Sequence, residues 1–247
     1  YNKIIKKNKL NYSLLRQREY FKLCDLVIVN SKAQETIIHS WNKNIPVIVT
    51  VNGQNLDSFL KYRNHSDSPA ICFYGSLSNQ FNRKALKRLL EHIFPIIKNI
   101  IPETKLYIIG INPPMDIINK FKNNSIIVTG YVTDIKPHLS KCKVMVLPLE
   151  TGAGFRGRVA EAMALGIPVV GTSNALQSIG LENGKQGYIE EDNNKIAEKV
   201  CLILKNNELF KEMSENCRKF AAANFSLEST FGKLSKIIQS LEAKVSN

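Results

Sequence analysis

The sequence lacks any hydrophobic run long enough to span a membrane. Apolar stretches such as Val144 to Leu147 are short, whereas a membrane-spanning helix needs roughly 20 mainly apolar residues. The start, Tyr1-Asn2-Lys3, also lacks the charged and apolar segments of a signal peptide. Because no initiator Met is present, we expect that a cut has removed an upstream part of a longer protein.

Paired cysteines are absent as well. The five cysteines are an odd number without a CxxC pair, which argues against a disulfide scaffold or a zinc ribbon. We expect Cys72 and Cys142, in apolar strand-like runs, to pack as small hydrophobic side chains. The four His residues are scattered without the spacing of metal ligands, so we expect no metal site. Isolated reduced thiols predict a cytoplasmic protein.

Negative charge is scarce in the first quarter of the chain. The net charge is +13, and the first 65 residues hold 11 Lys and Arg but only 4 Asp and Glu. A basic surface attracts nucleic acid, anionic lipid or a phosphorylated substrate, although solvated lysines without any partner explain it equally well. No nucleic-acid-binding module is recognisable, so we expect no nucleic-acid partner. Peripheral contact with the inner face of a membrane, or with an anionic acceptor, fits the basic segment.

The length of 247 residues allows one large domain, or one domain and a fragment of another. Residues 1–23 have a helical look, runs at 26–29 and 46–51 resemble strands, and Ser31 is expected to cap the helix between them. Residues 62–69 resemble a polar linker. Further strands are predicted at 70–74, 105–109, 125–128, 144–147, 168–171 and 188–190. Further helices are predicted at 83–100, 115–122, 134–140, 157–165, 194–205 and from there to the end.

The regular alternation after residue 70 predicts the fold class. Continuous apolar strands that alternate with helices indicate a parallel sheet covered on both faces, which is a doubly wound, Rossmann-like α/β domain. Four strands end in Gly or in a turn that contains it, at Gly75, Gly110, Gly130 and Gly152. Glycine suits strand-to-helix turns in general, but ligands also bind beyond the carboxyl ends of such strands.

The turn after Leu149 gathers groups that suit phosphates. Three glycines let the backbone approach a ligand closely: Gly152, Gly154 and Gly157. The first amides of the following helix attract anions, and Arg156 and Arg158 add two positive charges. Glu161 lies three residues after Arg158 on nearly the same helical face, where a carboxylate can accept hydrogen bonds from sugar hydroxyls. The pattern indicates a nucleotide or a nucleotide sugar.

Two other interpretations of this turn stay open. In the first, Arg156 and Arg158 are surface charges and Glu161 pairs with Arg158. In the second, the G-x-G-x-x-G spacing binds NAD or FAD. That motif follows the first strand of its fold, with an acidic residue about 20 positions on. Here it follows about the fourth strand, and the next strand ends in Gly171-Thr172 without an acidic residue.

Residues 154–170 resemble the signature of the family 4 (group 1) retaining glycosyltransferases of the GT-B fold. The likeness continues upstream in the same order and covers nearly the whole chain. It involves residues 73–77 with Asn82, 106–110, 128–132 with Asp134 and, before the linker, 25–31 and 51–53.

The resemblance implies roles for individual residues. Glu161 would hold the ribose hydroxyls of a nucleotide donor, and Arg156 and Arg158 would offset the charge of its departing diphosphate; these three are the implied catalytic residues. Tyr131 and Val132 would meet the base. The residues implied to bind the donor are Gly75, Ser76, Asn82, Gly130, Tyr131, Val132, Gly152, Gly154 and Phe155.

The resemblance also implies a reaction. A sugar would pass from a nucleotide diphosphate sugar to a saccharide or lipid-linked acceptor in glycan synthesis, with retention of anomeric configuration and without a metal or other cofactor. Two positions depart from the family pattern. Ala153 stands where a second Glu often contacts the donor sugar, and Ser76 stands where Arg often follows Gly. The departures leave the sugar open, as the sequence leaves open the base, the acceptor and the oligomeric state.

We expect three regions on this basis. Residues 1–65 would be the remnant of an acceptor domain with the linker, residues 66–226 the donor domain, and residues 227–247 a C-terminal helix. With most of the acceptor domain absent, we predict that the chain binds a nucleotide sugar but transfers the sugar poorly. A catalytically silent nucleotide-binding module and an NAD-binding oxidoreductase are the alternatives.

Overall fold

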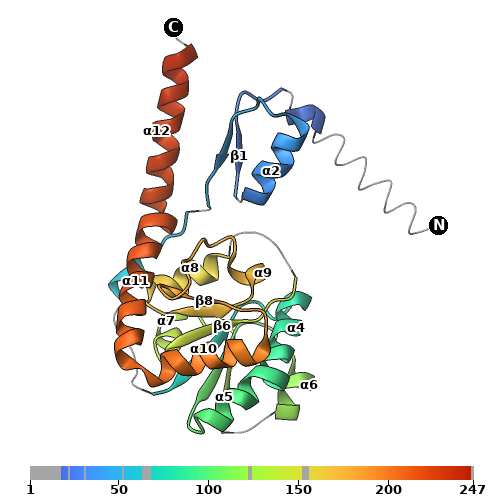
Figure 1. The fold of residues 1–247 in the computed structure, drawn as a ribbon, viewed down its shortest axis with the longest axis vertical. Coiled ribbons are helices and arrows are strands. Elements are labelled where there is room, and N and C mark those ends of the chain that lie inside the picture. The colour runs from blue at the N-terminus through green and yellow to red at the C-terminus, as the bar shows by residue number, and fades with distance from the viewer. Residues whose placement is uncertain are drawn as a thin grey trace, which may run out of the picture. The chain divides into compact units, whose positions relative to one another are not determined.

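The computed structural model divides the chain into two compact units, residues 1–52 and 53–247, shown in Figure 1. The residues that it describes are 18–21, 23–30, 32–51, 53–62, 68–121, 124–151 and 156–245. Within these ranges, no helix is long and apolar enough to cross a membrane. Of the helix predicted for residues 1–23, residues 18–21 are helical and Leu23 lies in a turn. The other residues of this prediction lie outside the described residues.

In the described part of the first unit, a helix connects a parallel pair of strands. Strands β1 (Val27–Val29) and β2 (Val47–Val49) pair along their whole length, and α2 (Lys32–Trp41) connects them. Phe21 packs against its small hydrophobic core. The predicted order of strand, helix and strand is confirmed, while the predicted cap Ser31 lies outside the described residues.

The second unit is built on a six-stranded parallel sheet with the order β5-β4-β3-β6-β7-β8. The chain builds outward from β3 to one edge, returns to the centre at β6, and builds outward to the other edge. The point between β3 and β6, where the direction reverses, is where such sheets bind ligands. The predicted doubly wound α/β fold is confirmed. The strands are β3 (Ala70–Tyr74), β4 (Lys105–Ile109), β5 (Ile126–Gly130), β6 (Val144–Leu147), β7 (Val169–Gly171) and β8 (Gly187–Ile189).

Helices cover both faces of this sheet. Figure 1 shows α8 on one side of the strands and α10 on the other; α8 packs against α11, and α10 packs against α5. Strands β3 and β6 are buried between these layers, which explains their apolar sequences. The helices are α3 (Asp57–Lys61), α4 (Gln80–Arg88), η1 (Leu89–Ile93), α5 (Phe94–Ile100), α6 (Met115–Ile118), η2 (Asn119–Phe121), α7 (Lys136–Leu139), α8 (Gly157–Ala164), α9 (Ser173–Leu176), α10 (Asn193–Lys205), α11 (Asn207–Phe225) and α12 (Leu227–Val245).

The long helix after β3 starts earlier than the predicted residue 83 and changes type in its middle. Asn79 caps its start, because the side-chain oxygen accepts the backbone N–H of Phe81 at 2.8 Å. The middle segment η1 is a π-helix in which Phe94 donates its backbone N–H to Leu89. Pro95 follows without a backbone N–H, which favours this wider turn.

The segment that leads into the second unit is tied to its helices. Arg218 in α11 donates to the backbone oxygens of Leu60 and Ala164, which joins the ends of α3 and α8. Gln54 forms a parallel bridge with Ser226 between α11 and α12. Residues 54–62 therefore pack within the second unit, and the predicted domain limits at 65 and 226 stay predictions.

Candidate functional site

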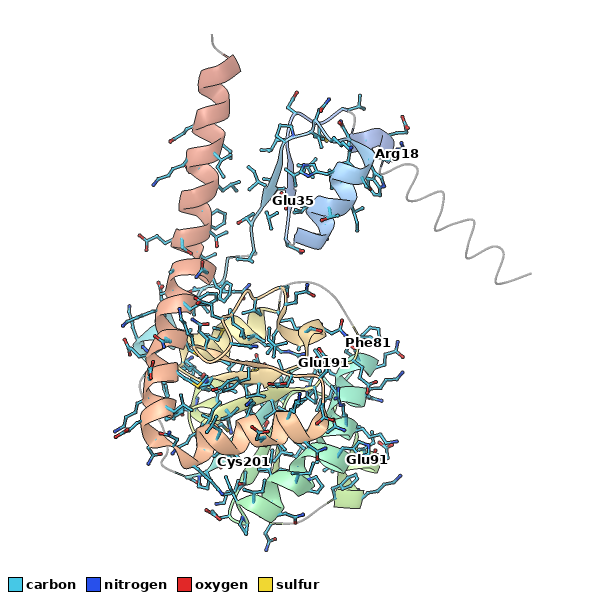
Figure 2. All side chains as sticks on the ribbon, viewed as in Figure 1. Arg18, Glu35, Phe81, Glu91, Glu191 and Cys201 are labelled. Carbon is cyan, nitrogen blue, oxygen red and sulfur yellow. The ribbon has the colours of Figure 1, made fainter. Side chains whose placement is uncertain are left out.

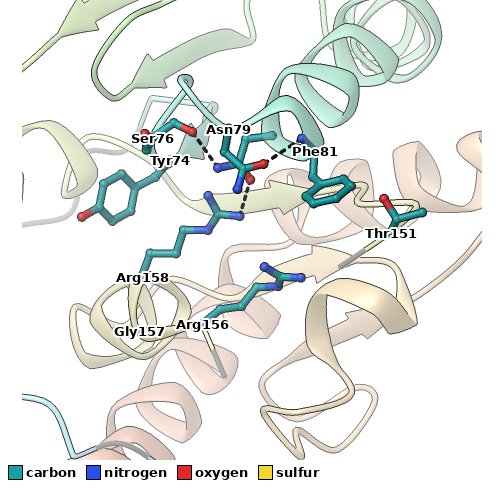
Figure 3. A pocket seen from close by; sticks show the side chains of 10 residues that line it. Tyr74, Ser76, Asn79, Phe81, Thr151, Arg156, Gly157 and Arg158 are labelled. Carbon is teal, nitrogen blue, oxygen red and sulfur yellow. Dashed lines mark hydrogen bonds between the residues drawn. The ribbon is translucent and has the colours of Figure 1, made fainter. Parts of the chain in front are cut away.

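A pocket of about 370 Å³ opens at the carboxyl ends of β3 and β6. Its walls come from the turn after β3, the start of α4 and the start of α8, and Figure 3 shows their side chains converging there. This is the position at which a doubly wound sheet binds ligands. The lining residues are Tyr74, Gly75, Ser76, Asn79, Phe81, Asn82, Thr151, Arg156, Gly157 and Arg158.

Asn82 connects the two sides of this pocket. It is 8% exposed on the first turn of α4. Its Oδ1 accepts a bond from Nη2 of Arg158 at 2.9 Å, and its Nδ2 donates to the backbone oxygen of Ser76 at 2.7 Å (Figure 3). The carboxamide thus fixes the turn after β3 and the guanidinium of α8 at the same time.

Gly75 makes room for that guanidinium. Its φ of +152° lies in a region that L side chains rarely adopt, and a Cβ there would come within 1.7 Å of Nη1 of Arg158. The Arg158 group therefore lies directly against the backbone of the turn. Burial lowers the pKa of Arg158 to about 10, and the neighbouring charge of Arg156 adds to this effect. Arg158 is still cationic at neutral pH.

Arg156 stands at the N-cap position of α8, without a side-chain cap bond. Its Nη2 donates to the backbone oxygen of Asn174 in α9 at 3.2 Å, and burial lowers its pKa. The Asn174 side chain in turn donates to the backbone oxygen of Glu150 at 2.7 Å. Asn174 thus holds both ends of the glycine-rich turn. The start of α8 also carries two cations, Arg156 and Arg158, next to backbone amides that favour anions.

Glu161 lies one turn further along α8 and is bonded to strand β3. The Tyr74 hydroxyl donates to Oε2 of Glu161 at 3.0 Å. Burial raises the pKa of Glu161, and the bond from Tyr74 opposes that rise. Burial also raises the pKa of Tyr74, as does the negative charge of Glu161. The phenol is therefore a neutral donor across the physiological range.

The structure brings only part of the predicted site together. Gly75, Ser76, Asn82, Arg156 and Arg158 line one pocket. Glu161 is not among the lining residues but bonds to one of them, Tyr74. The predicted base-binding turn is two strands away, at the end of β5, and is not part of the pocket lining. There Tyr131 is 72% exposed, and Gly130 has a φ of +67°. Gly152, Gly154 and Phe155 lie outside the described residues, as does Ala153.

Several residues in the pocket or close to it in the fold were not predicted. Phe81, 40% exposed, and Asn79 come from the first residues of α4, where the cap signal of Asn79 could have been recognised. Figure 2 shows Phe81 and Glu191 at the same end of the second unit; both follow strand ends, and the Glu191 carboxylate accepts the backbone N–H of Ser173. Thr151 and Asn174 carried no signal, because their roles depend on the folded turn.

The arrangement suits a ligand with phosphate and hydroxyl groups. Two guanidinium groups and the start of helix α8 offer positive potential at the switch point of the sheet, and a carboxylate on the same helix is bonded to Tyr74 in the pocket wall. Within the described ranges, no group of three or more His, Cys, Asp and Glu side chains could hold a metal ion. The expectation of a reaction without metal stays a prediction.

These features define an α/β protein with a crevice lined by two arginines, and comparison with known proteins gives its family. Residues 68–206, more than half of the chain, match the family described as glycosyl transferases group 1, and the chain belongs to it. The predicted group 1 glycosyltransferase with a GT-B fold is confirmed. Membership of family 4 and retention stay predictions.

Relatives and solved structures agree with this family. An uncharacterized glycosyltransferase of Methanocaldococcus jannaschii is 23% identical over 95% of this chain. A point mutant of Staphylococcus aureus TarM, solved with fondaparinux, α-GlcNAc-glycerol and UDP, covers 89% of the chain with 20% identity and a TM-score of 0.73. Anabaena HepE, solved with UDP and glucose, covers 88% with 16% identity and a TM-score of 0.69. The chain spans 64% of the length of the first protein and 45% and 63% of the other two.

Proposed function

We propose that this chain carries the donor-binding half of a glycosyltransferase that uses a nucleotide diphosphate sugar. The observation that carries the proposal is the Arg158 guanidinium, held by Asn82 against the backbone of Gly75 at the switch point of the sheet. A diphosphate bound there accepts bonds from Arg158, Arg156 and the first amides of α8. The UDP in the TarM and HepE structures supports this class of ligand.

The proposed mechanism follows from where charge develops. The acceptor hydroxyl oxygen bonds to the anomeric carbon, the bond from that carbon to the diphosphate breaks, and the acceptor proton passes to the departing phosphate oxygen, with retention of configuration. Negative charge grows on the diphosphate during this step. Preorganised cations at Arg156 and Arg158 stabilise it without a metal ion. Glu161 accepts bonds from the ribose hydroxyls, and Tyr131 and Val132 meet the base.

The acceptor is proposed to be a saccharide or a lipid-linked carrier, met in the cytoplasm or at the inner face of a membrane. The strongly basic first 65 residues favour an anionic acceptor or surface. Because the chain spans 64% of the length of its M. jannaschii relative, we also propose that these 247 residues bind the donor but transfer sugar poorly. Robust turnover by this chain alone would contradict that part of the proposal.

Calorimetric titration of the whole chain with UDP, GDP and their glucose and mannose derivatives tests the proposed donor site. We expect at least one of these nucleotides to bind, and both Glu161→Ala and Arg156→Ala to weaken binding by about 10-fold, which is the loss of one charge-assisted bond. Glu215→Ala and Lys219→Ala on the exposed side of α11 serve as matched charge controls. They should leave the affinity unchanged.

The same titrations separate the proposal from its competitors. If neither Glu161→Ala nor Arg156→Ala weakens nucleotide binding, the site is wrong. Binding of NADH without any response to UDP or GDP sugars would overturn the function in favour of an oxidoreductase.

A further inference from the structure

The hydrogen bond from Tyr74 to Glu161 has no role in the donor site proposed above. Tyr74 is the last residue of β3, and it lines the pocket. Its hydroxyl reaches across the switch point to Glu161, 87 positions later in the sequence. Strand β3 and helix α8 belong to opposite halves of the doubly wound sheet. The bond therefore joins a side chain of one half to a side chain of the other.

We propose that Tyr74 is a positioning residue that holds one carboxylate oxygen of Glu161 and leaves the other oxygen for a hydroxyl of the bound nucleotide. The inference rests on the proposed function, in which Glu161 accepts ribose hydroxyls. It adds to that function a phenol that determines which oxygen is offered to the ligand and in which direction.

The hydrogen bonding of the pair supports this division. Oε2 accepts the Tyr74 hydroxyl at 3.0 Å, and Tyr74 is the hydrogen-bond partner that the described part of the chain gives this carboxylate. A carboxylate that rotates freely presents either oxygen, whereas one bonded oxygen fixes the plane of the group. A fixed acceptor loses less entropy when it binds a ligand.

The electrostatics of the pair act in the same direction. Burial raises the pKa of Glu161, and the Tyr74 bond opposes this by stabilising the anion. Tyr74 bonds to Glu161 from β3, and the charge of Arg158, on α8 itself, acts on Tyr74. On the other elements packed against α8, Arg218 of α11 bonds to the far end of the helix, Asp57 and Lys61 of α3 are exposed, and β7 has no titratable residue.

Tyr74→Phe removes the hydroxyl and keeps the ring, so it isolates this contact. The Glu161 carboxyl can be titrated by NMR in protein labelled with carboxyl-¹³C glutamate, with Glu161→Gln identifying its resonance. We expect the pKa of Glu161 to rise in Tyr74→Phe, because a stabilising donor is gone. Tyr107→Phe is the matched control on the neighbouring strand β4, outside the pocket, and should leave the resonance unchanged.

Binding of UDP across a pH series gives a second measurement. UDP binding that needs the ionised Glu161 weakens as the pH is lowered and this carboxylate becomes protonated. Because the pKa of Glu161 should be higher in Tyr74→Phe, the affinity of this variant should begin to fall at a higher pH than that of the wild type. The ratio of the two affinities should therefore be smallest at high pH, at about 3-fold, and should grow as the pH falls. The titration of UDP itself cancels in this ratio. In Glu161→Gln the affinity should no longer follow the titration of this carboxyl.

The outcomes distinguish the inference from the function on which it rests. If the wild type binds none of the nucleotides, the donor site fails, while the NMR titration still tests the Tyr74–Glu161 contact. If the wild type binds UDP but Tyr74→Phe changes neither the pKa of Glu161 nor the affinity ratio, the donor site stands and the positioning role is wrong. An equal affinity loss at every pH, with an unchanged pKa, also overturns it, because a purely structural contact predicts that result.

Discussion

The two strand-to-helix junctions that face each other across the pocket are built on different principles. At the β3–α4 junction, the Asn79 side chain caps the helix, and neutral groups line the pocket. At the β6–α8 junction, the N-cap residue Arg156 makes no side-chain cap bond, and two guanidinium groups line the pocket. The Asn79 side chain satisfies one of the free amides of α4, whereas the Arg156 side chain satisfies none of those of α8.

The difference shows how shape and charge are divided in this site. The first junction supplies close backbone approach at Gly75 and a rigid carboxamide at Asn82. The second supplies the cations and the carboxylate. Two hydrogen bonds, from Arg158 to Asn82 and from Tyr74 to Glu161, join the junctions. Substitutions that change one junction, or one of these two bonds, separate their contributions to ligand binding.

The largest effect should come from the β6–α8 junction, the charged junction, which carries Arg156 and Arg158. Arg158→Gln keeps a donor for Asn82 but removes the charge, and we expect UDP affinity to fall about 100-fold, as loss of a buried charge-assisted bond predicts. Arg156→Gln should cost about 10-fold, since its guanidinium also bonds to the Asn174 backbone. Calorimetry measures both. A larger loss in Arg156→Gln than in Arg158→Gln would show that the deeper cation is not the main phosphate ligand.

The second-largest effect should come from a substitution that changes the shape of the site and not its charge. Gly75→Ala places a Cβ against Arg158 at a φ of +152°, so we expect about 2 kcal/mol lower stability and about 30-fold weaker UDP binding. Urea unfolding and calorimetry test the two parts. Gly180→Ala is the control, because its φ of +73° is also unfavourable while nothing lies within 4 Å of the new Cβ. It should lose stability without losing affinity.

Placing a charge in the β3–α4 junction, which is otherwise neutral, should cause a smaller loss of UDP affinity. Asn82→Asp places a negative charge beside Arg158, where it competes with a phosphate for the same guanidinium. We expect about 10-fold weaker UDP binding, against about 3-fold for Asn82→Ala, which only releases the side chain. Equal losses in a calorimetric comparison would mean that Arg158 does not bind the phosphate.

The smallest effect should follow from loosening the charged turn at its ends. Asn174→Ala removes the bond to Glu150 but keeps the backbone oxygen that Arg156 uses. We expect about 1 kcal/mol lower stability and about 3-fold weaker UDP binding. Gln177→Ala, an exposed change just after the same helix, should alter neither. An unchanged affinity in Asn174→Ala would separate the anchoring of this turn from ligand binding.

Sequence reasoning was most successful where the signal was local. The strands β3, β4 and β6 were predicted with their observed limits, because buried parallel strands are short continuous apolar runs. The charged junction was visible for a similar reason, since Arg156, Arg158 and Glu161 stand within six residues of a glycine-rich turn.

The neutral junction could not be predicted to the same extent. The pairing of Tyr74 with Glu161 depends on strand order and on the crossing of the chain, which periodicity does not encode. At the β6–α8 junction, Asn174 was also missed, because it lies in α9, a helix of four residues, which is too short to show a helical period. The start of α4 was placed too late because Asn79 was not recognised as its cap.

The parallel bridge between Gln54 and Ser226 has a topological consequence. The backbone oxygen of Gln54 accepts the N–H of Leu227, and the Gln54 N–H donates to the backbone oxygen of Phe225. The two ends of the segment 54–226 therefore lie next to each other. Neighbouring ends of this kind tolerate circular permutation. A short linker from residue 226 to residue 54, with new termini in an exposed turn, should therefore preserve the sheet and its pocket.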